Sequence, residues 1–399
     1  MAVEKQKPLV EIEAPHVEDQ RVATKSPTFI WLYVSIAGSL LLRASVLDFE
    51  SGDYNSFLSK WYDYLVEHGR WHGLGSREPA ATYPPLYLYL ISLSTLLPLP
   101  KLYAIKLISV LGDYVAALYV WRLAKRKSPA GWSAWLGVTA FLFLPTVVMN
   151  GALWGQCDVL YTTGFLASLY YLIERRPQAA LVAFGFSSAL KPQAIFWCPL
   201  LAGLFVARRL SWKCIWVSPA VYVACGMPAI LAGKPALDAL WYGGSLNLTP
   251  GLTLGAPNWY QWVFEQHPEI FWLPGVVLTL VATAFFILWI EQNTCEYSSR
   301  DRWLVSLALL SVLFPPFLLP GMHERYFFPA DVLSVVYAVF VPGGYWAAIM
   351  VQFASAFTYL PYLFEQEPVP RSLLSLAMLA AVGWVTRCLV LSRPYNAER

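Results

Sequence analysis

The chain has 399 residues, of which 57% are hydrophobic and 13% are charged, and its net charge is +3. Soluble domains carry about 25% charged residues, so the composition excludes an ordinary soluble protein and indicates a polytopic membrane protein. The small net charge gives no reason to expect a nucleic-acid partner. The six cysteines are scattered without a CxxC or Cys/His cluster, which predicts neither a disulfide framework nor a metal site.

Residues 1–27 are charged and contain proline, and we expect a cytoplasmic tail here and no signal peptide. Apolar segments follow, and a segment needs about 20 apolar residues to cross the hydrocarbon core as a helix. The sequence therefore predicts an all-α membrane protein of about 12 transmembrane helices in one domain, 28–393, with a cytoplasmic C-terminus at 394–399. The apolar segments are 28–46, 102–123, 132–150, 158–173, 178–190, 193–207, 214–232, 272–290, 303–320, 326–341, 345–363 and 372–391.

Basic residues set the predicted orientation. Lys and Arg gather in several connections between apolar segments and near the C-terminus, and the positive-inside rule places these connections in the cytoplasm. Both termini are then expected in the cytoplasm, with the loops 47–100 and 233–271 outside. Tyr83–Pro98 is short and bounded by prolines, so we expect it to lie along the outer interface without crossing. The basic connections are 122–127, 174–176, 208–213 and 300–302.

The first outer loop is acidic and aromatic. Gly52-Asp53 begins an amphipathic segment whose Phe57, Trp61 and Leu65 form an apolar stripe, which we expect to lie on the membrane. Asp53 can be interpreted as a helix N-cap or as a catalytic base. Asp48, nearer the first apolar segment, is the alternative base.

Two later motifs also carry ionisable residues at the outer face. In Trp154-Gly-Gln-Cys-Asp158 an acid begins an apolar segment, as a helix cap or as an active-site group. Lys191 precedes Pro192, which breaks the helix, and a charge inside the apolar zone should face a cavity.

His323-Glu324-Arg325 places three ionisable residues in a row at a membrane edge. These residues fit contact with lipid headgroups or a phosphate clamp, because Arg is a forked and permanently charged donor. The Ala256-Pro-Asn-Trp259 motif lies in an aromatic outer loop. It fits sugar binding or an interfacial aromatic belt.

Taken in order, the motifs over residues 40–340 resemble the GT-C superfamily of membrane glycosyltransferases. In particular they are similar to bacterial mannosyltransferases related to the second GPI mannosyltransferase, and the first loop also resembles the dolichol-phosphate-glucose transferases of N-glycan synthesis. The stretches that carry the resemblance are GD followed by YPPLYLYL, then LWGQCD, ALKPQA, APNW and MHERYFFPA.

The resemblance implies a GT-C fold with a long first outer loop carrying interfacial helices. It assigns catalysis to Asp53 and Asp158, with Asp48 as the alternative base. It assigns the donor phosphate to Lys191, His323 and Arg325. The residues expected at the sugar or acceptor are Tyr83, Trp154, Gln156, Gln193, Asn258, Trp259 and Glu324.

The implied reaction is an inverting transfer of a hexose, with mannose favoured, from a polyprenyl-phosphate donor to a hydroxyl of a lipid-linked, glycan or protein acceptor. We expect the bacterial inner (plasma) membrane, with the active site on the periplasmic face. No cofactor is expected, although Asp53 and Asp158 could share a divalent cation.

Three alternatives stay open. One is a transporter or flippase of lipid-linked sugars, which membrane charges would also fit but which the lack of visible repeats disfavours. Another is a GT-C enzyme for a different polyprenyl-phosphate sugar (glucose, arabinose or an aminosugar). The third is an inactive scaffold.

Overall fold

The computed structural model describes residues 28–76, 83–127, 132–240, 251–263, 268–293 and 300–391. The predicted tails, 1–27 and 394–399, lie outside these residues. Within them the chain is overwhelmingly helical, which confirms the predicted all-α class of polytopic membrane protein. The described part contains one small parallel pairing, in which β1 (Thr253–Leu254) lies beside β2 (Met322–His323).

Each predicted apolar segment contains a helix. The main helices are α1 (Thr28–Ala44), α5 (Lys101–Lys127), α6 (Trp132–Leu142), α7 (Pro145–Val148), α8 (Asp158–Ile173), α9 (Pro177–Leu190), α10 (Cys198–Val206), α11 (Val217–Leu231), α13 (Pro268–Gln292), α14 (Arg300–Leu318), α15 (Phe328–Phe340), α16 (Tyr345–Phe364) and α17 (Arg371–Leu391). Short π- and 3-10 segments link them at Met149–Leu153, Pro192–Trp197, Trp212–Cys214, Trp259–Trp262 and Glu324–Phe327.

The expected number of about 12 spans is not confirmed. Six described helices are long and apolar enough to cross a membrane, or seven if the pair around α6 and α7, bent by 48°, counts as one span. The bend follows Leu144, where Pro145 begins the second piece, since proline cannot continue the hydrogen bonding of the first. Helices such as α9, with 14 residues, fall short of the roughly 20 residues that a crossing needs.

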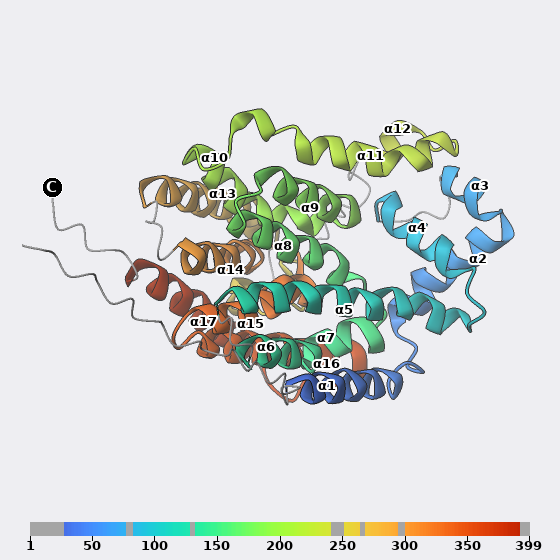
Figure 1. Cartoon of the computed structure of the whole chain (residues 1–399), viewed down its shortest axis with the longest axis horizontal. Coiled ribbons are helices and arrows are strands. Elements are labelled where there is room, and N and C mark those ends of the chain that lie inside the picture. Colours follow the sequence, from blue (N-terminus) through green and yellow to red (C-terminus); the bar gives the residue numbers. More distant parts are fainter. Residues whose placement is uncertain are drawn as a thin grey trace, which may run out of the picture.

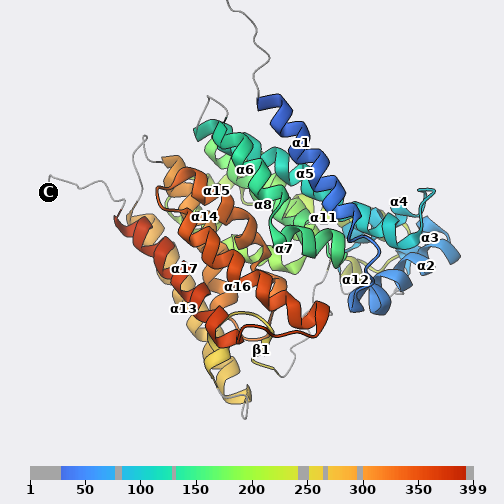
Figure 2. The same cartoon turned by 90° about the horizontal axis from the view of Figure 1, so that it is seen from below.

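The described part of the loop 47–100, which we expect to lie outside, folds into its own group of helices at one end of the bundle. It forms a π-helical turn (Tyr54–Leu58) and the helices α2 (Ser59–Glu67), α3 (Arg70–Gly75) and α4 (Pro85–Ser94). In Figure 1 this group lies at the right, next to α12 (Ala236–Leu240), while α1 begins and α17 ends toward the opposite end. Figure 2 shows the same separation from below.

Two residues of the apolar stripe that we expect to lie on the membrane, Trp61 and Leu65, pack inside this group instead. Trp61 and Leu65 are buried with Tyr87 and Ile91 of α4 in a small separate core, while Phe57 is 45% exposed. Trp61 and Leu65 therefore hold α2 against α4, because the contact removes the apolar surfaces of both helices from water.

The α4 helix does not have the length of a span. Its 10 residues cover about 15 Å at 1.5 Å per residue, half of a ~30 Å hydrocarbon core. An ion pair of 2.7 Å between Lys101 Nζ and Asp63 Oδ2 joins the chain on the two sides of α4. The Tyr89 hydroxyl also donates to the Cys225 carbonyl of α11, at 3.0 Å. The chain thus enters and leaves α4 at the same end of the bundle.

Two buried cations hold the beginning of the outer loop. Arg43, in the last turn of α1, forms an ion pair of 2.8 Å with Asp113 of α5, and both side chains are at most 1% exposed. Lys106 Nζ donates to the carbonyls of Leu47 and Phe49, at 2.9 and 2.6 Å. These contacts fix the path of the chain from α1 to Gly52-Asp53.

We predict that α4 stays on one side of the membrane. Cysteines introduced as Lys60→Cys and Leu99→Cys, both at exposed positions, should react with an impermeant thiol reagent from the same side of sealed vesicles. Lys213→Cys, at the opposite end of the bundle, should react only from the other side, and the unsubstituted chain gives the background. Labelling of Lys60→Cys and Leu99→Cys from opposite sides would overturn the one-sided arrangement.

Candidate active site

Asp53 does not cap a helix with its side chain. It precedes the π-helical turn at Tyr54 and makes no capping hydrogen bond. Ser51 caps the turn instead, because its hydroxyl accepts a hydrogen bond from the Tyr54 amide at 3.1 Å. The same hydroxyl donates to the Trp154 carbonyl at 2.7 Å. Asp53 Oδ2 accepts instead from Trp154 Nε1 at 2.9 Å and from Gln156 Nε2 at 2.5 Å. Both donors lie more than 100 residues after Asp53 in the sequence, and together they orient its carboxylate.

Gln156 connects Asp53 to a buried ion pair. Lys191 Nζ lies 2.6 Å from Asp158 Oδ1, and the two side chains are 1% and 2% exposed. Lys191 Nζ also donates to Gln156 Oε1 at 3.2 Å, and the Tyr83 hydroxyl donates to the same oxygen at 3.2 Å. Because the amide oxygen receives two donors, the amide nitrogen of Gln156 faces Asp53.

Backbone geometry explains why these side chains meet. Gly155 has φ +84°, a conformation that costs an L-residue about 1–2 kcal/mol, so glycine lets the chain turn between Trp154 and Gln156. The Ser109 hydroxyl of α5 donates to the Gln156 carbonyl at 2.6 Å and holds this turn. Lys191 adopts extended backbone where α9 ends, as expected before a proline.

His323 and Arg325 of the His-Glu-Arg motif line the same cavity as Asp53. Arg325 Nη1 is 3.3 Å from Glu324 Oε1, and its guanidinium lies 5.4 Å from the ring centre of Trp154. Arg325 Nε is buried and makes no hydrogen bond within the described residues. The pairing of Leu254 with His323 holds this motif against the second outer loop. The side chains of His323 and Arg325 are 34% and 13% exposed, and both line the cavity, where an anion could contact them.

The cavity between these groups has a volume of about 270 Å³. Several of the residues predicted from the sequence line it: Asp53, Tyr83, Gln156, Gln193, His323 and Arg325. Desolvation raises the pKa of Tyr83, which keeps its hydroxyl protonated as a donor to Gln156. The remaining lining residues are Phe57, Leu58, Trp61, Pro192, Leu254, Gly321, Tyr326 and Tyr362.

Other predicted residues stand behind this lining. Trp154 contacts the side chain of Asp53, and Glu324 contacts that of Arg325. Both residues thus support the lining without being part of it. Lys191 and Asp158 are buried and paired with one another. Asp158 Oδ2 further accepts from Asn150 Nδ2 at 2.9 Å, so its carboxylate is already occupied. Among the described residues no group of three His, Cys, Asp or Glu side chains could hold a metal ion.

Three predicted residues are not brought to the cavity. Asp48 is exposed and accepts a hydrogen bond from the Tyr103 hydroxyl. Asn258 is buried, and its side chain accepts from the Tyr260 amide and donates to the Leu319 carbonyl. Trp259 is 45% exposed. Asn258 thus stabilises the loop by capping a 3-10 turn.

Tyr362, in α16, lines the cavity but is not among the residues predicted from the sequence. Its ring stacks on Trp154 with ring centres 4.6 Å apart, and its hydroxyl interacts with Asp53. Nothing in the local sequence marks it, because a tyrosine near the end of an apolar helix is usual at a membrane interface.

Residues 81–319, more than half of the chain, match glycosyltransferase family 87. The chain belongs to glycosyltransferase family 87. This family is of the GT-C type, so the predicted GT-C glycosyltransferase is confirmed, and an integral membrane enzyme is indicated. The match does not support the finer resemblance to the second GPI mannosyltransferase. A comparison with curated proteins gave no match.

The matched range includes Gln156, Asp158 and Lys191 but not Asp53 or the His323–Arg325 motif. The family assignment therefore rests on the part of the site that contains the buried ion pair. The contacts of Asp53 with Trp154 and Gln156, and of Arg325 with Trp154, link the candidate base and the His323–Arg325 motif to that part.

We predict that Trp154→Phe lowers glycosyl transfer. Phenylalanine keeps an aromatic ring beside Tyr362 but lacks the Nε1 donor to Asp53, and a hydrogen bond to a charged group contributes about 1.5–3 kcal/mol, so turnover should fall roughly 10- to 100-fold. Trp259→Phe, outside the cavity, is the matched control and should retain wild-type turnover. Equal turnover in the two variants would show that the indole donor does not orient the base.

Proposed function

We propose that this family 87 enzyme transfers a hexose, with mannose favoured, from a polyprenyl-phosphate donor to an acceptor hydroxyl with inversion. The observation that carries the proposal is the cavity that the oriented carboxylate of Asp53 shares with the guanidinium of Arg325 and the ring of His323. A base and an anion-binding group on two sides of one cavity are what a displacement at a sugar phosphate requires.

In the proposed step Asp53 takes the proton of the acceptor hydroxyl as its oxygen attacks C1 of the sugar. The bond between C1 and the phosphate oxygen breaks, and its electron pair leaves with the polyprenyl phosphate. The leaving phosphate gains negative charge, which Arg325 and His323 stabilise. Trp154 and Gln156 both bind Oδ2 of Asp53, so they orient the carboxylate without binding Oδ1.

The buried environment of Lys191 suggests a different role from the phosphate binding that we expected. Its charge is already balanced by Asp158, and it is 1% exposed. We assign it to positioning, because it fixes the amide of Gln156 and through it the carboxylate of Asp53. Arg325 then provides the main contact to the phosphate, supported by His323.

A lipid-linked donor fits the position of the cavity. The cavity is lined in part by Phe57 and Leu58 of the π-helical turn and Trp61 of α2, and these elements lie at one end of the helical bundle (Figure 1). There a phosphate can sit at the boundary between lipid and water while its polyprenyl chain stays in the bilayer. We place this end at the periplasmic face of a bacterial inner membrane, because the Lys- and Arg-rich connections lie at the other end.

The direct test uses the purified chain in lipid nanodiscs with synthetic polyprenyl-phosphate mannose and an acceptor extract. Release of free polyprenyl phosphate with appearance of a mannosylated product supports the proposal. The glucose, arabinose and aminosugar donors are tested in parallel, and turnover of one of these alone would replace mannose. Movement of intact donor across the bilayer without cleavage would favour a flippase.

We predict that Asp53→Asn lowers turnover by about 10²–10⁴-fold, the range for loss of a general base. Asparagine keeps the shape of the side chain and an oxygen for Trp154, but it cannot take the proton. Donor binding and thermal stability should change little. Asp48→Asn, at an exposed position outside the cavity, is the control and should stay active. Wild-type turnover of Asp53→Asn would move the base to Asp48 or Asp158.

We predict that Arg325→Ala reduces turnover more than donor binding, because the leaving phosphate carries more charge in the transition state than in the bound donor. Arg325→Lys should restore activity only partly, since the forked donor is lost. Donor affinity and turnover are measured on protein of verified thermal stability. A structure with a donor analogue whose phosphate lies more than about 6 Å from Arg325 and His323, beyond direct or single-water contact, would refute the assignment.

A further inference from the structure

Asp331 is a buried acid that the proposed reaction does not use. It lies in the first turn of α15, and its side chain is fully buried. Neither Oδ1 nor Oδ2 has a hydrogen-bond partner among the described residues. Within them, the groups that act on this carboxyl are two hydroxyls and no cation. Because an unpaired carboxylate inside a protein is strongly unfavourable, Asp331 needs either a proton or a bound cation.

The polar side chains around Asp331 come from three helices. Thr146 Oγ1 of α7 donates to Gln352 Oε1 of α16 at 3.0 Å, and Gln352 Nε2 donates to the backbone carbonyl of Asp331 at 3.3 Å. The hydroxyls of Thr146 and Ser355 lie next to the carboxyl itself. The helices α7, α15 and α16 therefore meet at this acid.

Oxygen atoms face one another here without a proton between them. Because Thr146 gives its proton to Gln352, its oxygen can meet the carboxyl only as an acceptor. The hydroxyls of Ser355 and Tyr359 are buried and, like the Asp331 carboxyl, have no hydrogen-bond partner among the described residues. Tyr359 follows Ser355 by one turn of α16, and its hydroxyl lies within electrostatic reach of Asp331. Buried polar atoms are nearly always satisfied in folded proteins, so this group of oxygens points to a ligand.

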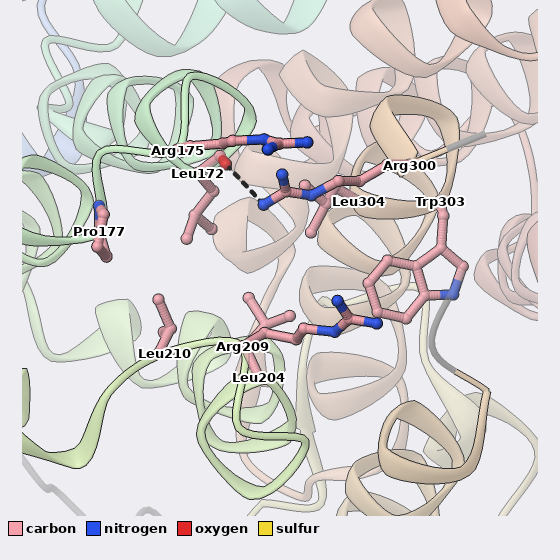
Figure 3. A pocket seen from close by; sticks show the side chains of 9 residues that line it. All are labelled: Leu172, Arg175, Pro177, Leu204, Arg209, Leu210, Arg300, Trp303 and Leu304. Carbon is pink, nitrogen blue, oxygen red and sulfur yellow. Dashed lines mark hydrogen bonds between the residues drawn. The ribbon is translucent and has the colours of Figure 1, made fainter. Parts of the chain in front are cut away.

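Other charged groups inside the bundle have partners within the chain. Lys191 binds Asp158 in the candidate active site. A second cavity, of about 280 Å³, lies between the ends of α8 and α10 and the beginning of α14, and arginines line it. Figure 3 shows this cavity, where Arg300 Nη2 donates to the Leu172 carbonyl at 3.4 Å. Asp331 differs from these groups, because the described chain offers its carboxyl no opposite charge.

We propose that Asp331 binds an alkali-metal cation, Na⁺ or K⁺, inside the bundle. The hydroxyl oxygens of Thr146, Ser355 and Tyr359 complete the set of ligands. Hard cations take oxygen ligands of these kinds. One carboxylate balances one positive charge, so a monovalent ion fits better than Mg²⁺ or Ca²⁺, which commonly take more than one carboxylate. The helix dipole at the beginning of α15 also favours the charged form of Asp331.

A cation at this point would hold together the helices behind the candidate active site. The Tyr359 ring packs edge-on against Trp154, with ring centres 5.4 Å apart, and Trp154 donates to Asp53. The turn that carries Arg325 leads directly into α15. The cation is thus expected to stabilise the fold around the cavity without contacting a substrate.

The test measures cation binding by the full-length chain purified in detergent. Its thermal unfolding midpoint is followed during titration with NaCl or KCl against choline chloride, at constant ionic strength. Choline is too large for a fully buried site and gives the background. We expect a saturable rise of the midpoint with Na⁺ or K⁺, since a ligand of the folded state stabilises it. The ion that acts at the lower concentration is the preferred ligand.

Variants show whether Asp331 is the site. Asp331→Asn keeps the shape of the side chain but removes its charge, and it should lose the response to both ions. Ser355→Ala removes one ligand and should weaken the apparent affinity by about 3- to 10-fold, as expected for one polar contact. Ser334→Ala is the matched control, because Ser334 is fully buried in α15 and its hydroxyl donates to the Asp331 backbone carbonyl at 2.8 Å. It should bind as the wild type does.

Equal unfolding midpoints of the wild type in Na⁺, K⁺ and choline would show that Asp331 keeps a proton, and would overturn the proposal. A wild-type response in Asp331→Asn would show a general salt effect, with the same consequence. If Asp331→Asn does not fold, equal affinities of Ser355→Ala and Ser334→Ala refute the site. The inference is independent of the transfer reaction, and Asp53→Asn is expected to keep the full response to the cation.

Discussion

The buried ion pair between Lys191 and Asp158 determines how the rest of the site is arranged. Two charges removed from water are stable together only when their remaining donors and acceptors are satisfied. Asn150 and the Gln156 amide meet that requirement. As a result, the end of α9, the beginning of α8 and the turn before it are held in one geometry, and the orientation of Gln156 fixes the carboxylate of Asp53. The candidate base is thus oriented by a charge pair that does not itself reach the cavity.

The positions of the helices and several site residues could be predicted from the sequence, because both depend on patterns within short stretches of the chain. Long apolar segments mark helices in helical membrane proteins, and each predicted segment contains one. Placing an ionisable residue within the membrane costs free energy. Asp53, Lys191 and Arg325 are therefore predicted to need a partner or a ligand. The structure brings all three into one network around a cavity.

What the sequence could not supply were distances between remote residues. The sequence predicts Lys191 as a phosphate ligand and Asp158 as a catalytic group. Only the fold shows that the two side chains bind one another. Asn258 fitted sugar binding by residue type, yet its amide caps a turn. Tyr362 lies 309 positions after Asp53 and carried no signal. The number of spans stays a prediction for a related reason: the bend at Pro145 and helices as short as α9 depend on packing inside the bundle.

Gly255 shows how the two halves of the site are divided along the chain. Its φ is +89°, and a Cβ atom there would lie 3.1 Å from Glu324 Oε2, so the second outer loop rests directly on the partner of Arg325. Apart from Tyr362, the groups around Asp53 come from residues 51–191, whereas Arg325, its partner Glu324 and the loop that supports them come from residues 251–326. An engineer could therefore reshape the loop beside Glu324 to change which donor is accepted while leaving the proton-accepting half of the enzyme untouched.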